Sequence, residues 1–111
     1  MNAEYDKSER KLTMYLEGEI DQNSASMIRK EMDRCIRERK GLLMLSLDLA
    51  GVSFMDSSGI GMLIGRYRKI IRNNGVAEIT NVKPELHRIF EMSGILKIMN
   101  ENMAHTVRHY E

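Results

Sequence analysis

The sequence predicts an α/β domain with a mixed, mostly parallel sheet of four to five strands and about four helices. The chain has 111 residues, which can bury one core but are too few for two domains, so residues 1–111 are expected to form one unit. Short apolar strand patterns alternate with amphipathic helix patterns along it. Such alternation is typical of parallel strands joined by helical crossovers.

The N-terminal part of the chain predicts two strands followed by a helix. Residues 12–16 alternate apolar and mixed side chains, as a strand with one buried face does, and residues 3–6 are expected to pair with them as a short edge strand. A loop is expected over residues 18–23. Residues 24–40 predict an amphipathic helix. Its apolar stripe consists of Ile28, Met32, Cys35 and Ile36.

The middle of the chain predicts a buried strand and a second helix. Residues 42–47 are nearly all apolar, as in a central strand covered on both faces, and residues 52–54 are expected to extend that layer. Residues 57–73 carry apolar side chains at helical spacing. This second stripe consists of Ile60, Leu63, Ile64, Tyr67, Ile70 and Ile71.

The C-terminal part predicts four short elements. Residues 76–80 form an expected strand. A third helix is expected over residues 84–92, because Pro84 suits the first turn of a helix. Residues 96–99 are expected to form a last short strand, and residues 102–109 a final helix.

Small polar residues and glycines mark the expected helix ends. Asn23 or Ser24 is expected to cap the start of the first helix, and Gly41 suits the position after its end. The second helix is expected to end at residues 73–75, Asn-Asn-Gly, and the third at Gly94. These signals set the boundaries of the three helices.

The composition excludes several classes of function. The formal net charge is +1 and both signs are mixed along the chain, so direct binding to nucleic acid or to a membrane is not expected. The single cysteine, Cys35, cannot form a disulfide within the chain, and neither a metal nor another cofactor is expected. The polar N-terminus lacks the apolar core of a signal peptide, and no apolar run approaches the roughly 18 residues that span a bilayer. A cytoplasmic location is therefore expected.

The segment FMDSSGIGMLIGRY, residues 54–67, carries the strongest functional signal. Asp56, Ser57 and Ser58 lie where an apolar strand gives way to a glycine-punctuated helix. A serine hydroxyl at a helix N-terminus lies near free backbone N–H groups and the positive end of the helix dipole, which favour a phosphate. That phosphate could belong to a bound nucleotide or be attached to the serine itself.

A nucleotide site and a hydrolytic site both fit this segment poorly. Gly59, Gly61 and Gly65 do not have the G-x-G-x-x-G spacing, and no lysine follows them as it would in a P-loop. The carboxylate of Asp56 would oppose a pyrophosphate. The nucleophile motif G-x-S-x-G is absent, and the spacing of the histidines groups none of them with a serine. The chain is therefore not expected to be an enzyme.

Two interpretations of the serines remain open on the residues alone. In the first, Asp56 caps the helix and both serines are ordinary residues of a capped helix start, which is a common arrangement. In the second, Ser57 lies in the first turn near solvent and is phosphorylated. A phosphate there gains the dipole and the N–H groups, and it adds about −1.5 to −2 charges without unfolding the helix.

The glycines of the second helix have two explanations, close packing of the helix on a neighbouring element or a bare helix face that a partner approaches, and the second is favoured. Each glycine costs a helix up to about 1 kcal/mol relative to alanine. Gly61 and Gly65 lie off the apolar stripe, where a partner could approach closely. Arg66 begins the basic side of the same helix. Such a side is usually a solvated face, but its position beside the serines suggests that a partner docks there. This side comprises Arg66, Arg68, Lys69 and Arg72.

These residues resemble a known family. Residues 54–61, F-M-D-S-S-G-I-G, followed by G-R-Y at residues 65–67, resemble the anti-sigma factor antagonists, which carry a STAS domain. Residues 18–21, G-E-I-D, are similar to the family's first loop, and residues 88–98 to its third helix and the following turn. The resemblance covers nearly the whole chain in order. The G-R-Y and F-E-M-S-G segments are closer to the sporulation branch of the family than to its general-stress branch.

The resemblance implies a STAS-like fold and a partner-switching function. In this family the unphosphorylated antagonist binds an anti-sigma factor that is also a serine kinase, and so releases the sigma factor. The kinase uses ATP to phosphorylate the first serine of D-S-S-G, which corresponds to Ser57. A PP2C-type, metal-dependent phosphatase reverses the reaction. The aspartates that lie near this serine in the family correspond to Asp21 and Asp56.

The resemblance also implies a contact region and leaves one alternative. The region beside the serine corresponds to Ser58, Gly59 and Gly61. The family often has two glycines where this chain has Asn74 and Gly75, a difference that is expected to affect only a turn. The alternative function is a STAS module that binds a small ligand or acts as a scaffold and is never phosphorylated.

Overall fold

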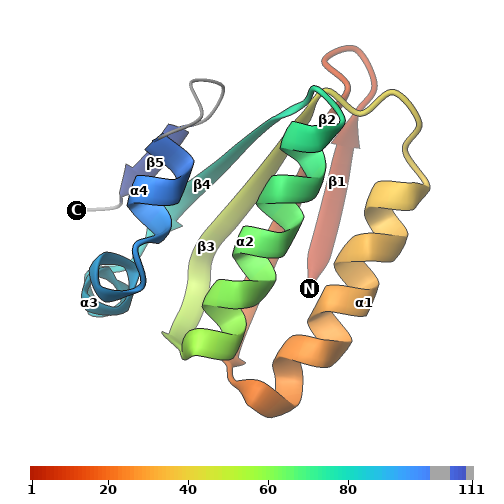
Figure 1. Ribbon diagram of the computed structural model, residues 1–111. Coiled ribbons are helices and arrows are strands. Elements are labelled where there is room, and N and C mark those ends of the chain that lie inside the picture. Colours follow the sequence, from red (N-terminus) through yellow and green to blue (C-terminus); the bar gives the residue numbers. More distant parts are fainter. Residues whose placement is uncertain (101–105, 110–111) are drawn as a thin grey trace.

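A computed structural model describes residues 1–100 and 106–109 of the chain, and up to α3 its strands and helices follow the predicted order. Figure 1 shows their arrangement. The elements are β1 (Asn2–Asp6), β2 (Lys11–Ile20), α1 (Gln22–Arg37), β3 (Met44–Met55), α2 (Ser57–Arg72), β4 (Val76–Val82), α3 (Pro84–Ser93), α4 (Ile95–Asn100) and β5 (Thr106–His109).

The five strands form one sheet in the order β1-β2-β3-β4-β5. β1 pairs antiparallel with β2, and all other neighbours are parallel. This confirms the predicted mixed, mostly parallel sheet. Crossovers between parallel strands share one hand, so a sequential strand order brings successive helices to the same face. Figure 1 shows α1 and α2 side by side on that face, both starting at the edge where β2 and β3 end.

The core lies between the sheet and these helices. Alternate residues of β2 point into it, and Leu12, Met14 and Leu16 are all buried. Met32 of α1 and Leu63 of α2 are fully buried against them. The predicted stripe of α2 is therefore the face that packs on the sheet.

The β2–α1 junction differs from the predicted loop over residues 18–23. β2 continues to Ile20, and α1 begins at Gln22. The strand passes through Gly18 in the left-handed region, with φ of +81°, and its pairing with β3 shifts register nearby. Glycine adopts this conformation at no steric cost, and with this irregularity the strand continues into residues that were predicted as a loop.

The predicted last strand and final helix are wrong. Residues 96–99 belong to the helix α4, and residues 106–109 form the strand β5, while residues 101–105 lie outside the described part. Gly94 ends α3 with φ of 74°, and its carbonyl oxygen accepts a hydrogen bond from Ile98 N at 3.0 Å, which starts a new helical turn. A short apolar run such as I-L-K-I fits either state, and the free edge of β4 provides the pairing for β5.

Candidate functional site

The starts of α1 and α2 lie next to each other because β2 and β3 are parallel neighbours. Ile20 and Met55, the last residues of these strands, are paired across the sheet. Each is followed by an aspartate and then by a helix. The backbone N–H of Asp56 donates a hydrogen bond to the carbonyl oxygen of Ile20 at 3.2 Å, which joins the two junctions directly.

Asp56 is the N-cap of α2, as predicted. Its Oδ1 accepts hydrogen bonds from the backbone N–H groups of Ser58, at 2.9 Å, and Gly59, at 3.3 Å. Ser57 is the first helical residue and is exposed, whereas Ser58 is half-buried. The hydroxyl of Ser57 therefore reaches solvent at a helix start whose first N–H groups are satisfied by the carboxylate of Asp56.

Asp21 caps α1, so the predicted cap at Asn23 or Ser24 is wrong. Its carboxylate accepts from the backbone N–H groups of both residues at 3.0 Å, and the Ser24 hydroxyl accepts from Asp21 N at 3.0 Å. This reciprocal pair is a capping box. The hydrogen bond from the Ser24 backbone is the main cause that lowers the pKa of Asp21 below its usual value. Asp21 is therefore negatively charged at neutral pH.

The glycines of α2 have two different structural roles. Gly59 is buried, and a Cβ atom there would lie 2.5 Å from Met55 Cγ and 3.1 Å from the carbonyl oxygen of Ile20. It is needed for close packing of the helix start on the strand ends. Gly61 and Gly65 would place a Cβ in open space, with nothing within 4 Å. The structure therefore leaves these two positions available to a partner.

Arg66 does not lie on a freely solvated face. Its Nε is 3.1 Å from Oδ1 of Asp33, across the interface between α1 and α2, and Lys69 Nζ is 3.7 Å from the same oxygen. Burial is the main cause that lowers the pKa of Arg66 from its usual value. The sequence placed Arg66 and Lys69 on the basic side of the second helix without indicating that this side meets α1.

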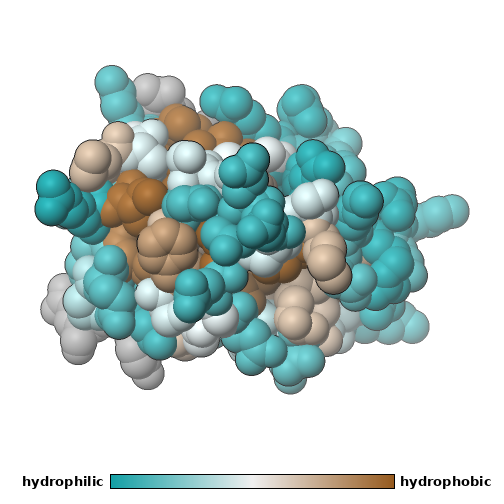
Figure 2. Space-filling view, turned by 90° about the horizontal axis from the view of Figure 1, so that it is seen from below, coloured by the Kyte–Doolittle hydropathy of each residue, from teal (hydrophilic) through white to brown (hydrophobic). Residues whose placement is uncertain are grey.

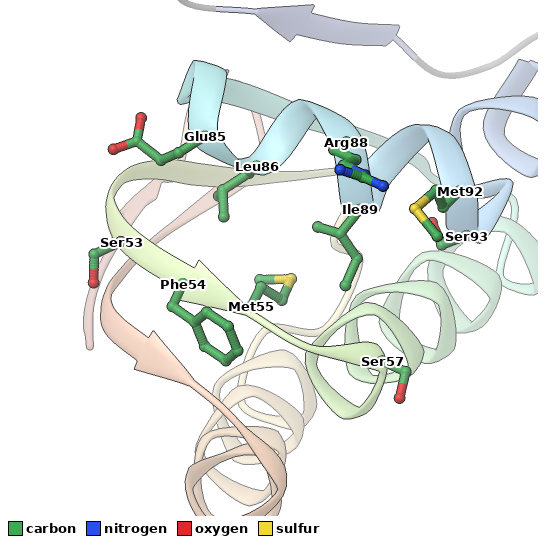
Figure 3. Close-up of a pocket in the computed structure, with 10 residues that line it drawn as sticks. All are labelled: Ser53, Phe54, Met55, Ser57, Glu85, Leu86, Arg88, Ile89, Met92 and Ser93. Atoms are coloured by element: carbon green, nitrogen blue, oxygen red, sulfur yellow. The ribbon is translucent and has the colours of Figure 1, made fainter.

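A groove between the end of β3 and α3 was not predicted. It has a volume of about 460 Å³. Figure 3 shows Leu86 and Ile89 of α3 directed toward Phe54 and Met55, with Ser57 at its edge. The side chain of Phe54 is 47% exposed. The residues that line the groove are Ser53, Phe54, Met55, Ser57, Glu85, Leu86, Arg88, Ile89, Met92 and Ser93.

The molecular surface around this groove is apolar. Figure 2, which views the molecule from below, shows brown apolar side chains gathered between teal polar ones. Met92 is 75% exposed and lies off the buried face of α3, which Leu86 and Phe90 define. Met92 is an apolar residue outside the apolar stripe of α3, and this is the sequence signal that could have indicated the surface.

In the described part of the chain, no group of three or more His, Cys, Asp or Glu side chains could hold a metal ion. None of its helices has the length and apolar character required to cross a membrane.

Comparison with known proteins agrees with this geometry. Residues 2–109 match the STAS domain family. The chain is 40% identical over 88 residues to the anti-sigma F factor antagonist of Paenibacillus polymyxa, covering 79% of this chain and 74% of that protein. It is 26% identical over 100 residues to the anti-sigma-B factor antagonist of Bacillus subtilis, covering 90% and 89%.

Solved structures show the same fold. Unphosphorylated SpoIIAA, an anti-sigma factor antagonist, aligns with a TM-score of 0.64 at 25% identity, over 82% of this chain and 81% of that one. The phosphorylated form of SpoIIAA, a Bacillus cell fate determinant, aligns with a TM-score of 0.66 at 24% identity, over 96% and 88%. The chain belongs to the STAS domain family and, within it, to the anti-sigma factor antagonists.

Proposed function

We propose that this antagonist is switched by phosphorylation of Ser57. In the unphosphorylated state it binds an anti-sigma factor that is also a serine kinase, and this releases the sigma factor. The kinase transfers a phosphoryl group from ATP to Ser57 and then dissociates. A PP2C-type phosphatase hydrolyses the phosphate and restores the binding state. The chain itself acts as a substrate and a binding partner.

The observation that carries the proposal is the exposed Ser57 hydroxyl at the first position of a helix that is already capped. Because the Asp56 carboxylate satisfies the N–H groups of Ser58 and Gly59, a phosphate on Ser57 is not required for the helix to form. The modification can therefore change the surface and leave the fold in place. Solved structures of SpoIIAA in its unphosphorylated form and in its phosphorylated form support such a two-state cycle for a relative.

The charges around Ser57 support a mechanism in which a phosphate on this serine weakens binding of the partner by repulsion. Asp56 immediately precedes it, and Asp21 lies at the adjacent helix start. A phosphate adds about −1.5 to −2 charges to this pair of carboxylates. Ser57 also lines the apolar groove, so a partner that covers the groove must desolvate the phosphate. Losing about 3 kcal/mol of binding energy lowers an affinity by about two orders of magnitude.

The proposal is tested with the purified chain, its cognate kinase and ATP. Intact-mass measurement is expected to show one added phosphate on the wild type and on Ser58→Ala, and none on Ser57→Ala. Treatment with a PP2C-type phosphatase and its metal is expected to remove it. If the wild type gains no phosphate, the alternative of a STAS module that binds a ligand or acts as a scaffold replaces the switch.

Binding measurements test the charge mechanism. Ser57→Asp is expected to weaken binding to the kinase by about a hundredfold, whereas Ser57→Ala keeps wild-type affinity. Ser8→Asp is the matched control, because Ser8 lies in the turn at the opposite end of β2. Wild-type affinity of Ser57→Asp, or an equal loss in Ser8→Asp, would contradict local repulsion.

A further inference from the structure

We propose that the groove between β3 and α3 is the interface of a weak, two-fold symmetric dimer of this chain. Two observations point to a second copy as its occupant. Apolar side chains are exposed on both walls of the groove, and the charged residues that line it, Glu85 and Arg88, have opposite signs. The dimer is independent of the proposed phosphorylation, because a phosphate takes no part in these contacts.

The first argument is the concentration of apolar surface at the groove. Phe54 of β3 is 47% exposed and Met92 of α3 is 75% exposed, and both line the groove. Aromatic residues, methionine and arginine are the types that are enriched in protein interfaces. Elsewhere in the described part of the chain, the large exposed apolar side chains lie separately on β2, on α1 and before β3. These are Tyr15, Met27 and Leu43. The groove is therefore the surface that favours a protein partner.

The second argument is that the charges of the groove are self-complementary. Glu85 and Arg88 are exposed and lie three residues apart on α3, which places them on the same side of the helix. Neither forms an ion pair in the described part of the chain. In a two-fold symmetric interface each contact occurs twice, with the two residues exchanged between the copies. An axis that passes between these two side chains would therefore bring Glu85 of each copy against Arg88 of the other.

The charge and size of the molecule indicate how strong the dimer is. The formal net charge of the chain is +1, so long-range repulsion between two copies is small. The groove is lined by 10 residues, whereas a stable interface uses about 20–30 residues on each side. The dimer is therefore expected to be weak and to depend on the concentration of the chain.

The dimer would cover the start of α2. Ser57 lines the same groove, so a second copy bound there lies over this serine. Dimerisation would therefore compete with any protein that must reach Ser57. A low concentration of the chain would favour that protein, and a high concentration would favour the dimer.

The dimer is tested by sedimentation velocity of the full chain from about 1 µM to about 1 mM, a range that includes weak interfaces. The mass of the wild type is expected to rise from that of a monomer to about twice that value. Phe54→Ser is expected to weaken the dimer at least about tenfold. Leu43→Ser is the matched control, because Leu43 is 50% exposed and lies just before the opposite end of β3. It is expected to associate like the wild type.

Charge reversals test the two-fold symmetry. Glu85→Arg and Arg88→Glu each place like charges against one another across the axis, so each variant alone is expected to associate at least about tenfold more weakly than the wild type. In an equimolar mixture of the two variants, every such pair again has opposite signs. The mixture is expected to associate about as tightly as the wild type, and this rescue requires that both variants are folded.

Three results would overturn the proposal: a wild type that stays monomeric over the whole range, a mixture that does not restore association, or equal losses in Phe54→Ser and Leu43→Ser. If the wild type is monomeric and Phe54→Ser loses affinity for the anti-sigma factor, the groove is the docking site of that protein and not of a second copy. The phosphorylation of Ser57 is tested separately by intact mass, so failure of the dimer leaves the proposed switch unaffected.

Discussion

At the scale of single residues, the two aspartates at the helix starts explain how one site can be both stable and switchable. Each carboxylate accepts hydrogen bonds from the N–H groups of its own helix. Ser57 is left exposed beside Asp56 and takes no part in these capping bonds. The stability of the helix start therefore depends on the aspartate, and the signal depends on the serine.

Asp21 makes stability depend on acid pH. Its folded-state pKa is lowered by the Ser24 hydrogen bonds, so its contribution is present above the unfolded value of about 3.9 and is lost as pH falls through the lower folded value. Asp21→Asn keeps an acceptor at the cap but cannot titrate. We expect the melting temperatures of wild type and variant to be similar at pH 7, and the wild type to lose more stability below about pH 4.

Circular dichroism melts between pH 7 and pH 2.5 measure this difference. The melting temperature of the wild type is expected to fall below that of Asp21→Asn as acid protonates the carboxylate. A constant separation between the two proteins over the whole range would show that Asp21 has the same pKa in the folded and unfolded states.

At the scale of elements, α2 combines a tightly packed start with an open outer face. Gly59 lies against the ends of β2 and β3, whereas Gly61 and Gly65 border open space. The sequence predicted that the three glycines weaken the helix, and Gly61 and Gly65 were correctly placed off the apolar stripe. It did not assign a packing role to Gly59, because that role depends on the paired strand ends that meet this glycine in space.

Alanine substitutions are expected to separate these roles. Gly59→Ala places a Cβ 3.1 Å from the Ile20 carbonyl oxygen and 2.5 Å from a buried methionine side chain, so we expect a loss of about 1–3 kcal/mol in the free energy of unfolding. Gly61→Ala meets nothing and removes backbone freedom from the unfolded chain, so we expect a gain of about 0.4–1 kcal/mol. Urea unfolding measures both, and similar losses in the two variants would contradict this assignment.

At the scale of the whole molecule, the mostly parallel pairing of the sheet could be predicted but the groove could not. Alternating strand and helix patterns imply parallel crossovers, and the sheet confirms this. The groove joins residues 53–57 to residues 85–93, which the intervening strand β4 brings together. No local pattern encodes such a contact. The last two predicted elements were wrong for a related reason, because pairing at the free edge of β4 decides the state of residues 106–109.

Because the start of α2 is stabilised by Asp56 and not by Ser57, we expect a change at Ser57 to leave the stability of the whole chain nearly unchanged. Ser57→Asp adds a negative charge at the first position of α2, where the helix dipole favours it by about 0.3–1 kcal/mol, while the neighbouring carboxylate of Asp56 opposes it. Because these effects largely cancel and Ser57 is exposed, we expect its melting temperature to stay within about 4 °C of the wild type. Calorimetry and the amide spectrum check this, and Gly59→Ala serves as the destabilised reference. If Ser57→Asp melted as low as that reference, loss of kinase binding would reflect unfolding, and phosphorylation would act by disrupting the domain instead of by changing its surface.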